Sequence, residues 1–424
     1  MIATGRAPQR HWASGQDQAI AGLRYVVLFA DLETPLPSEL NDALSTIAAA
    51  GPHTRVALTP QPGRRLWSYD PRAPLSVYQL PDAVAKDGSA AVLQYIRRRP
   101  GFRHPLEVHV SQRQIAFDAD HGLGDGRFVV ELISALFALS GARTSPWVTN
   151  DDTRLALPRA LIRTFGIHPT RARMAWRYAA GLRSTHTVLP NVTSGSESVA
   201  WSPSFAVTVA HVNADAESSV NEWRCENAEK AGSAAVWLYI VRRALRAAGL
   251  QMTDEVMIAF DCRRYLPKRL TANSNFVEGL GIPFAVNETL PTMITRLREC
   301  TVSAVPLAAM GVVSARALLR AGRKPVTPPG CNVDALASVM YTDMGHLTSL
   351  DDLPWRGENE RSFTGLLDPG GPESITVLNS RIGGTRNISI SFHDNVFDRR
   401  VIERAADYLK DPIRFLTSNA LPPP

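Results

Sequence analysis

The segment FDADHGLGDGRFVVELISAL, residues 117–136, surrounds a single histidine, His121, with three aspartates and three glycines. A strand ending here would deliver the imidazole to a turn of small side chains, where it can project into a cleft. Imidazole has an ordinary pKa of about 6.5, so it accepts a proton from a hydroxyl or an amine near neutral pH. Asp125 can cap the following helix or pair with an arginine, and Gly126 permits a close backbone approach.

Three other chemistries fit this turn less well. A calcium loop needs glycine at its sixth place and glutamate at its twelfth, and neither frame of the segment has both. Dinucleotide binding fails because Arg127 stands where the third glycine is needed. Zinc needs further ligands, and the nearby His104 and His109 precede a separate strand, so no metal site is predicted. From the residues alone, a general base and a structural turn with a partly exposed histidine both stay open.

The composition bounds the class of protein. A chain of 424 residues exceeds the usual size of a single core, so two domains or subdomains are expected. The net charge of +6 comes from scattered arginines rather than from one cluster, which argues against specific nucleic-acid binding. The four cysteines show no paired spacing, and no apolar stretch is long enough to span a membrane. Without a secretion signal at the N-terminus, we expect a cytoplasmic protein.

Strand and helix patterns occur in both halves of the chain, which predicts an α/β architecture. Alternating or continuous apolar runs predict strands at 23–33, 106–110, 114–120, 205–212, 255–261 and 387–394. Helical spacing predicts helices at 37–52, 126–141, 231–249 and 398–411. The basic stretch 159–183 is expected to be helical in part, with Gly166 and Pro169 as interruptions. A segment rich in Ser, Thr and Pro, 184–203, is the predicted linker between an N-terminal subdomain, 1–183, and a C-terminal subdomain, 204–424.

Four segments together resemble one family. HGLGDG (121–126) is similar to the H-x-x-x-D-G half of the HHxxxDG signature of the condensation-domain superfamily, which includes carrier-protein condensation domains, alcohol acetyltransferases, polyketide-associated acyltransferases and the BAHD enzymes. FDCRRYLPKRLTANSNFVEG (260–279) resembles that superfamily's D-x-R-x-x-L-P strand and Asn-containing loop. SVMYTDMGHL (338–347) resembles its late S-N-x-G or D-F-G-type segment, and RNISISFHDNVFDRRVIERAADYL (386–409) its closing strand and helix.

The resemblance implies a chloramphenicol-acetyltransferase-like fold, with two pseudo-symmetric αβ subdomains around a central tunnel. It implies an acyltransferase in which His121 is the general base that activates an acceptor hydroxyl or amine. The acyl donor would be acyl-CoA or a phosphopantetheine-linked thioester on an acyl carrier protein, with no tightly bound cofactor. Asp125 and Gly126 would be structural, and Arg263 is the expected partner of Asp125, with Arg264 as the second candidate.

Five further residues are predicted to line or brace the tunnel: Asp120, Asn275, Thr342, Asp343 and His393. His393 also fits a polar sheet face, because it alternates with the apolar residues of its strand. Asp120 stands where the superfamily's signature has its first histidine. An acid beside the base can reorient the base or raise its basicity, or it can mark a member with altered chemistry. The alternative hypothesis is therefore a binding or docking module, or a protein recruited to another transformation.

Overall fold

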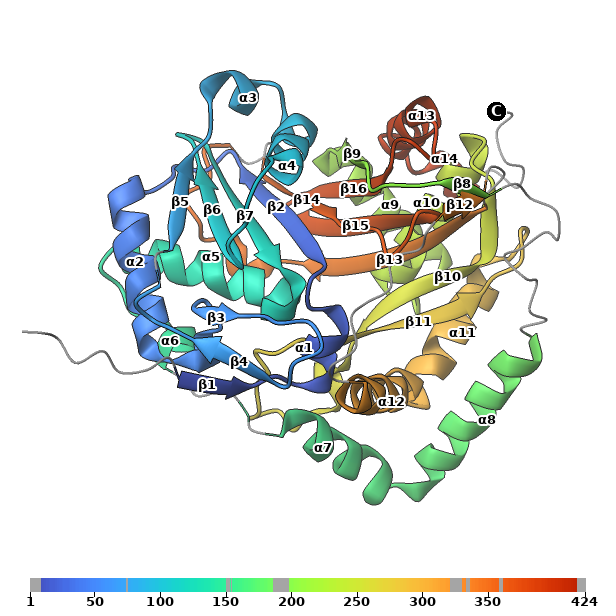
Figure 1. Cartoon of the computed structure of the whole chain (residues 1–424). Coiled ribbons are helices and arrows are strands. Elements are labelled where there is room, and N and C mark those ends of the chain that lie inside the picture. Colours follow the sequence, from blue (N-terminus) through green and yellow to red (C-terminus); the bar gives the residue numbers. More distant parts are fainter. Residues whose placement is uncertain are drawn as a thin grey trace, which may run out of the picture.

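The computed structural model describes residues 9–73, 75–149, 153, 155–185, 198–320, 330–332, 336–357 and 361–417. Two main β-sheets lie side by side, one built largely from the N-terminal half of the chain and one from the C-terminal half (Figure 1). Helices flank both sheets. The predicted α/β architecture is therefore confirmed.

The N-terminal sheet has the strand order β14-β2-β7-β6-β5. Its strands are β2 (Arg24–Ala30), β5 (Ser76–Gln79), β6 (Leu106–Val110), β7 (Gln114–Asp120) and β14 (Ser362–Leu367). β5 is parallel to β6, and the other neighbours are antiparallel. The strand predicted at 23–33 ends at Ala30, because Asp31 takes the left-handed conformation, with φ of 72°.

Strand β2 shows why this sheet is buried on both faces. Alternate residues Tyr25, Val27 and Phe29 contact α2 (Pro37–Ala50) and α5 (Gly126–Ser140). The intervening Val26 and Leu28 face α4 (Ser89–Arg98) on the other side. A strand between two helical layers has to be apolar at successive positions, as the run YVVLF is.

The C-terminal sheet has the order β11-β10-β13-β15-β16-β9. Its strands are β9 (Phe205–Val212), β10 (Met252–Asp261), β11 (Val277–Pro283), β13 (Ala337–His346), β15 (Ser374–Ile382) and β16 (Thr385–His393). Helices α10 (Ser233–Ala247), α11 (Leu290–Val302) and α13 (Arg399–Leu409) belong to the same apolar core as this sheet. The predicted stop after α10 is present, since Gly249 is left-handed with φ of 91°.

Strand β14 joins the two sheets. It comes from the C-terminal half of the sequence but pairs with β2 of the N-terminal sheet. The backbone N–H groups of Gly365 and Leu367 in β14 donate to the Oγ atoms of Ser389 and Ser391 in β16, at 3.0 and 3.1 Å. The alternating serines of β16 therefore bind the neighbouring sheet rather than water.

Shorter elements complete the chain: β1 (Gln9–Trp12), α1 (Gly15–Ile20), η1 (Pro52–Thr54), β3 (Leu58–Thr59), β4 (Leu66–Tyr69), α3 (Asp82–Lys86), η2 (His121–Leu123), α6 (Pro146–Thr149), β8 (Ser198–Ala200), α9 (Ala214–Asn227), η4 (Cys262–Tyr265), α12 (Val305–Leu319), β12 (Gly330–Asn332), η5 (Thr348–Leu350) and α14 (Arg414–Thr417). In the described ranges no single helix is long and apolar enough to cross a membrane. Only α11 and α12 taken together meet that length and composition, and they bend by 58° where they meet.

The basic stretch is interrupted as its sequence predicts. It forms α7 (Ala156–Leu161), a short π-helix η3 (Ile162–Gly166) and α8 (Pro169–Thr185). Much of the predicted linker, residues 186–197, lies outside the described residues, so the division into subdomains at 184–203 stays a prediction.

Candidate active site

His121 begins η2, a single turn of 3-10 helix directly after β7. The last residue of β7, Asp120, lies opposite Arg24 of β2 in the antiparallel register of the two strands. The chain leaves the sheet at this point, where the His121 backbone N–H donates to the carbonyl of Leu23 at 2.8 Å. Helix α5 then begins at Gly126, with Asp125 as its N-cap. The histidine therefore lies between a strand and a helix that are both packed into the N-terminal core.

All three carbonyl groups of η2 accept hydrogen bonds from side chains far away in the sequence. Asn275 donates from Nδ2 to the carbonyl of His121 at 2.9 Å. Arg55 donates from Nη2 to the carbonyl of Gly122 at 2.9 Å, and from Nε to the carbonyl of Leu123. An unpaired carbonyl costs free energy in a protein interior. These bonds therefore hold the backbone of the turn in one position.

One buried carboxylate, Asp17 of α1, holds both donors. Its Oδ1 accepts from the backbone N–H of Asn275 at 3.0 Å and from its side-chain amide at 2.9 Å, and it lies 3.0 Å from Nη2 of Arg55. Asn275, predicted as a tunnel residue, is 2% exposed and belongs to this network. Asp17 and Arg55 are not among the residues predicted from the sequence. The available signal was the capping box SGQD, in which Ser14 and Asp17 exchange hydrogen bonds.

The imidazole of His121 is half-buried and packs edge-on against the ring of Tyr25, with centroids 5.1 Å apart and an interplanar angle of 87°. Its Nδ1 atom is buried and has no hydrogen-bond partner among the described residues. Burial, together with the negative charges of Asp125 and Asp120, raises the pKa of Tyr25 far above its ordinary value. The phenol of Tyr25 is therefore uncharged at neutral pH, and its ring packs against the imidazole.

Asp125 connects the motif turn to the C-terminal half of the chain. It accepts two hydrogen bonds from Arg263, at 2.9 and 3.2 Å, and one from the backbone N–H of Phe276 at 2.9 Å. The Arg127 N–H at the start of α5 is a further donor, at 3.1 Å. Burial disfavours the charged carboxylate, but the charge of Arg263 and these donors outweigh burial and lower the pKa of Asp125. Asp125 is therefore a buried anion.

Arg263 also fixes the loop that carries Asn275. It donates to the carbonyl groups of Ala272 and Ser274, at 2.9 Å each. Arg264, the second candidate partner of Asp125, is exposed. The loop that carries Asn275 is therefore bound both by Arg263, the partner of Asp125, and by Asp17.

The Asp120 carboxylate caps the turn. Its Oδ1 accepts from the backbone N–H of Gly122 at 2.8 Å, and both its oxygens accept from the N–H of Gly22, at 3.2 and 3.1 Å. Burial raises the pKa of Asp120, although these two donors oppose the shift. Within the described residues no hydrogen bond joins Asp120 to His121, so the tunnel role of Asp120 stays a prediction.

Two glycines of the motif bring other segments close to the histidine. A Cβ atom on Gly122 would lie 2.9 Å from the ring of the buried Trp67, so no side chain fits there. A Cβ atom on Gly126 would lie 2.4 Å from the end of the Met344 side chain. The predicted segment of β13 therefore runs beside the motif. There Thr342 is half-buried, and Asp343 accepts a hydrogen bond from the hydroxyl of Tyr341 at 2.9 Å.

His393 lies at the end of β16, 1% exposed, against the rings of Trp201 and Phe205. Its Nδ1 accepts from the Ser204 N–H at 3.3 Å, and burial lowers the pKa of its imidazole. In the described part of the chain it makes no contact with His121. Its role along a tunnel stays a prediction.

One buried cluster, Glu107, His109 and Asp118, brings three possible metal ligands together. Arginines already pair with both carboxylates: Arg24 and Arg103 with Asp118, and Arg99 with Glu107. These guanidinium groups supply the positive charge that a cation would bring, so the donor set does not fit a resident metal.

No protein-family profile and no curated protein sequence matches the chain. Solved structures do match it. Trichothecene 15-O-acetyltransferase from Fusarium sporotrichioides aligns with a TM-score of 0.62 and 13% identity, over 98% of this chain and 97% of that one. The condensation domain of the monacolin K polyketide synthase aligns with a TM-score of 0.60 and 15% identity, over 96% and 98%. This chain has the condensation-domain fold.

The fold is shared by proteins with different activities. An F. sporotrichioides structure complexed with coenzyme A and T-2 aligns with a TM-score of 0.57 and 15% identity, over 93% of this chain and 96% of that one. An epimerization domain of tyrocidine synthetase B also has the condensation-domain fold. The predicted chloramphenicol-acetyltransferase-like fold class is therefore confirmed. A fold does not determine an activity, so the function has to be inferred from the residues around His121.

Proposed function

We propose that this protein is an acyltransferase that moves an acyl group from a coenzyme A or carrier-protein thioester to the hydroxyl, or the amine, of a small-molecule acceptor such as a natural product or a lipid. The observation that carries the proposal is the fixed backbone of η2, whose three carbonyl groups are bound by Asn275 and Arg55. A general base has to stay within hydrogen-bond reach of the proton that it removes. A restrained turn below a half-buried imidazole meets that requirement.

In the proposed reaction, Nε2 of His121 accepts the proton of the acceptor hydroxyl while the oxygen attacks the thioester carbonyl carbon. The intermediate then collapses with cleavage of the C–S bond, and the imidazolium returns the proton to the departing thiolate. Nε2 is assigned because Nδ1 is buried against the protein. Asp125 takes no part in proton transfer, because both of its oxygens accept hydrogen bonds from Arg263 and from backbone N–H groups, and these donors lower its pKa.

The acyl donor acts as a co-substrate rather than as a resident cofactor. The F. sporotrichioides structure with coenzyme A supports this donor class, because it shares the fold over most of both chains. Coenzyme A and carrier proteins present the same phosphopantetheine arm and the same thioester, so one binding face can serve either donor.

The test is release of free thiol from a panel of acyl-CoAs and acyl-pantetheines in the presence of hydroxyl and amine acceptors. We expect His121→Ala to abolish release and to unfold at the temperature of the parent protein. His168→Ala is the matched control, because His168 is exposed and lies outside the turn. Full activity of His121→Ala would refute the proposal.

A second candidate is a protein of this fold that does not transfer acyl groups. Asp120 favours it, because the superfamily's signature has a histidine there, and the epimerization domain shows that the fold carries other activities. Such a protein would release no thiol from any donor in the panel. Binding to a phosphopantetheinylated carrier protein without thiol release would then identify a docking module.

A further inference from the structure

One edge of the molecule is formed by a basic segment of the sequence that contains no acidic residue. Between residues 155 and 185 the sequence has six arginines and no aspartate or glutamate. This segment forms α7, η3 and α8, along the lower edge of the molecule in Figure 1. The exposed arginines of the edge are Arg159, Arg163, Arg171, Arg173 and Arg177. None of them forms an ion pair with a residue that the structure describes.

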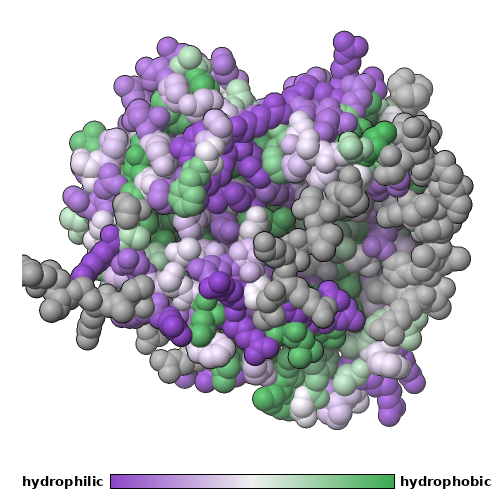
Figure 2. Space-filling model, in the orientation of Figure 1, coloured by the Kyte–Doolittle hydropathy of each residue, from purple (hydrophilic) through white to green (hydrophobic). Residues whose placement is uncertain are grey.

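Large apolar side chains are exposed on the same edge. Leu155 and Trp176 are each 72% exposed, Ile162 is 66% exposed and Ile167 is 65% exposed. Leu319 of the adjacent helix α12 is also exposed. Figure 2 shows hydrophobic side chains gathered at this edge of the molecule between hydrophilic ones. The edge therefore combines positive charge with apolar side chains that stay exposed in the part of the chain that the structure describes.

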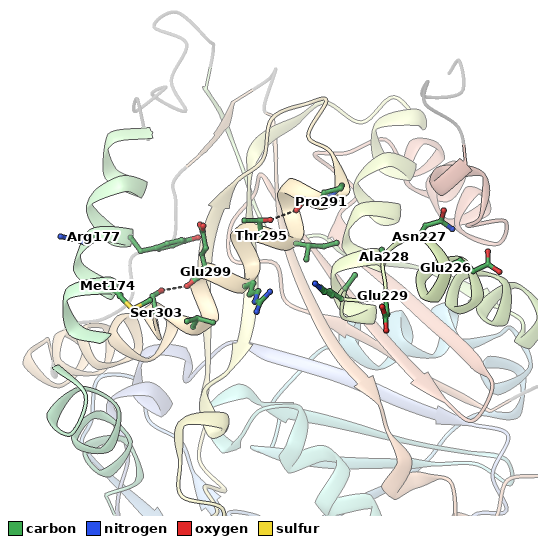
Figure 3. Close-up of a pocket in the computed structure, with 16 residues that line it drawn as sticks. Met174, Arg177, Glu226, Asn227, Ala228, Glu229, Pro291, Thr295, Glu299 and Ser303 are labelled. Carbon is green, nitrogen blue, oxygen red and sulfur yellow. Dashed lines mark hydrogen bonds between the residues drawn. The ribbon is translucent and has the colours of Figure 1, made fainter. Parts of the chain in front are cut away.

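Helix α8 packs against the C-terminal core through Ala175 and Tyr178. A groove of about 1130 Å³ separates it from α11 and from the connection between α9 and α10 (Figure 3). Met174 and Arg177 of α8 both line this groove (Figure 3). Arg173 and Trp176 are exposed at neighbouring positions, so α8 presents charge and an aromatic ring outward.

We infer that this edge, formed by α7, η3 and α8, docks the protein onto a membrane surface that contains anionic phospholipids. Arginines bind lipid phosphates, while isoleucine, leucine and tryptophan side chains enter the boundary between headgroups and acyl chains. Tryptophan is favoured at that boundary, because its ring is apolar and its N–H is polar. A membrane of this kind accounts both for the positive charge of the edge and for its exposed apolar side chains.

Two other kinds of partner match the edge less well. A nucleic acid would use the arginines, but its phosphates offer nothing to exposed aliphatic side chains. An acidic protein would use both, but it would favour apolar residues gathered at the centre of a patch. Here they are spread over three successive segments, of which α8 alone is about 25 Å long. A broad, flat surface fits this distribution.

The inference stands apart from acyl transfer, because the edge shares no residue with the turn of His121 and binding is measured without catalysis. The full chain is sedimented with phosphatidylcholine vesicles that either contain or lack phosphatidylglycerol. We expect sedimentation with the anionic vesicles alone, and release when salt screens the charges. Arg163→Gln/Arg173→Gln/Arg177→Gln is expected to lower the partition coefficient by roughly a hundred-fold, about five-fold for each arginine.

The matched control is Arg10→Gln/Arg72→Gln/Arg400→Gln, which removes the same charge from exposed positions elsewhere and should bind like the parent protein. Trp176→Ala should weaken binding at constant charge. Thermal unfolding shows that each variant is folded. Absence of sedimentation with anionic vesicles, or equal loss in both triple variants, overturns the inference. So does displacement from vesicles by an RNA oligonucleotide or by an acidic peptide at equal charge concentration.

Discussion

A single oxygen of Asp17 binds Arg55 and both amide groups of Asn275, and these two residues hold the carbonyl groups of the His121 turn. The proposed base is thus positioned through a carboxylate on a different helix. Ion pairs this deeply buried are costly to break, because removing one partner leaves an uncompensated charge. The geometry of the turn and the stability of the fold therefore depend on the same residue.

The first prediction concerns Asp17. We expect Asp17→Asn to lower the free energy of unfolding by roughly 3–5 kcal/mol, because Arg55 stays buried without its counter-ion. The folded fraction should turn over about a hundred-fold more slowly, since a displaced turn moves the imidazole. Urea denaturation and kcat for thiol release measure the two effects. Asp42→Asn, on the exposed face of α2, is the control; equal behaviour of the two variants would refute the positioning role.

The Asp125–Arg263 pair leads to a coupling prediction. Asp125→Asn and Arg263→Leu should each destabilise by roughly 3–5 kcal/mol, and the double variant by clearly less than the sum. The folded pKa of Asp125 is below its unfolded value, so its stabilisation is present above the unfolded pKa and is lost as pH falls through the folded pKa. The parent protein should therefore lose more stability in acid than Asp125→Asn does. Additive energies in the double-mutant cycle would argue against the pair.

Asp120 allows a test of what the carboxylate does. We expect Asp120→Asn to keep thiol release within a few-fold of the parent rate, because an amide oxygen can still accept from the N–H groups of Gly122 and Gly22. Burial raises the pKa of Asp120, so this variant should be at least as stable as the parent at neutral pH. Asp120→His, which places the first histidine of the HHxxxDG signature at this position, is measured alongside. A large loss of activity in Asp120→Asn would indicate that the acid itself takes part in the reaction.

Glu278 of β11 predicts a pH dependence of stability. Its side chain is 5% exposed and accepts a hydrogen bond from Gln16 at 3.1 Å, and burial raises the pKa of its carboxyl group from 4.5 to about 7. Between these two values the folded protein keeps a proton that the unfolded chain has lost, so the free energy of unfolding falls as pH rises. Glu278→Gln should remove this slope and gain up to about 3 kcal/mol above pH 7. Denaturation across this pH range measures the slope, with the exposed Glu403→Gln as control; an unchanged slope in Glu278→Gln would contradict the assignment.

Much of the fold follows from local patterns in the sequence. Helix α10 and its left-handed Gly249, and the interruption of the basic stretch between Gly166 and Pro169, lie where periodicity and turn residues predict them. The serines of β16 show the limit of such patterns. Alternation predicts that Ser389 and Ser391 share a face, but only the folded structure shows that β14 covers it.

The candidate site also contains residues that the sequence predicts and residues that it does not predict. The resemblance matched Asp125 with Arg263, and the two side chains form a two-point ion pair. For Asp17 the capping box was the available signal, and it predicts a helix start rather than a contact with the turn. Arg55 had no signal, because its contacts join segments far apart in the sequence. Alternation along β7 also stops at Asp120, where the strand ends and backbone N–H groups determine the direction of the carboxylate.

The position of β14 affects how the chain can fold during its synthesis. The strand pairs with β2, and β2 pairs with β7, which carries the His121 turn. On the ribosome, an edge of the N-terminal sheet therefore stays open until residues 362–367 have been translated. The N-terminal half made alone would expose the backbone of β2 as an unpaired edge, which invites aggregation. Splitting the gene between the halves should succeed only when both fragments are produced together.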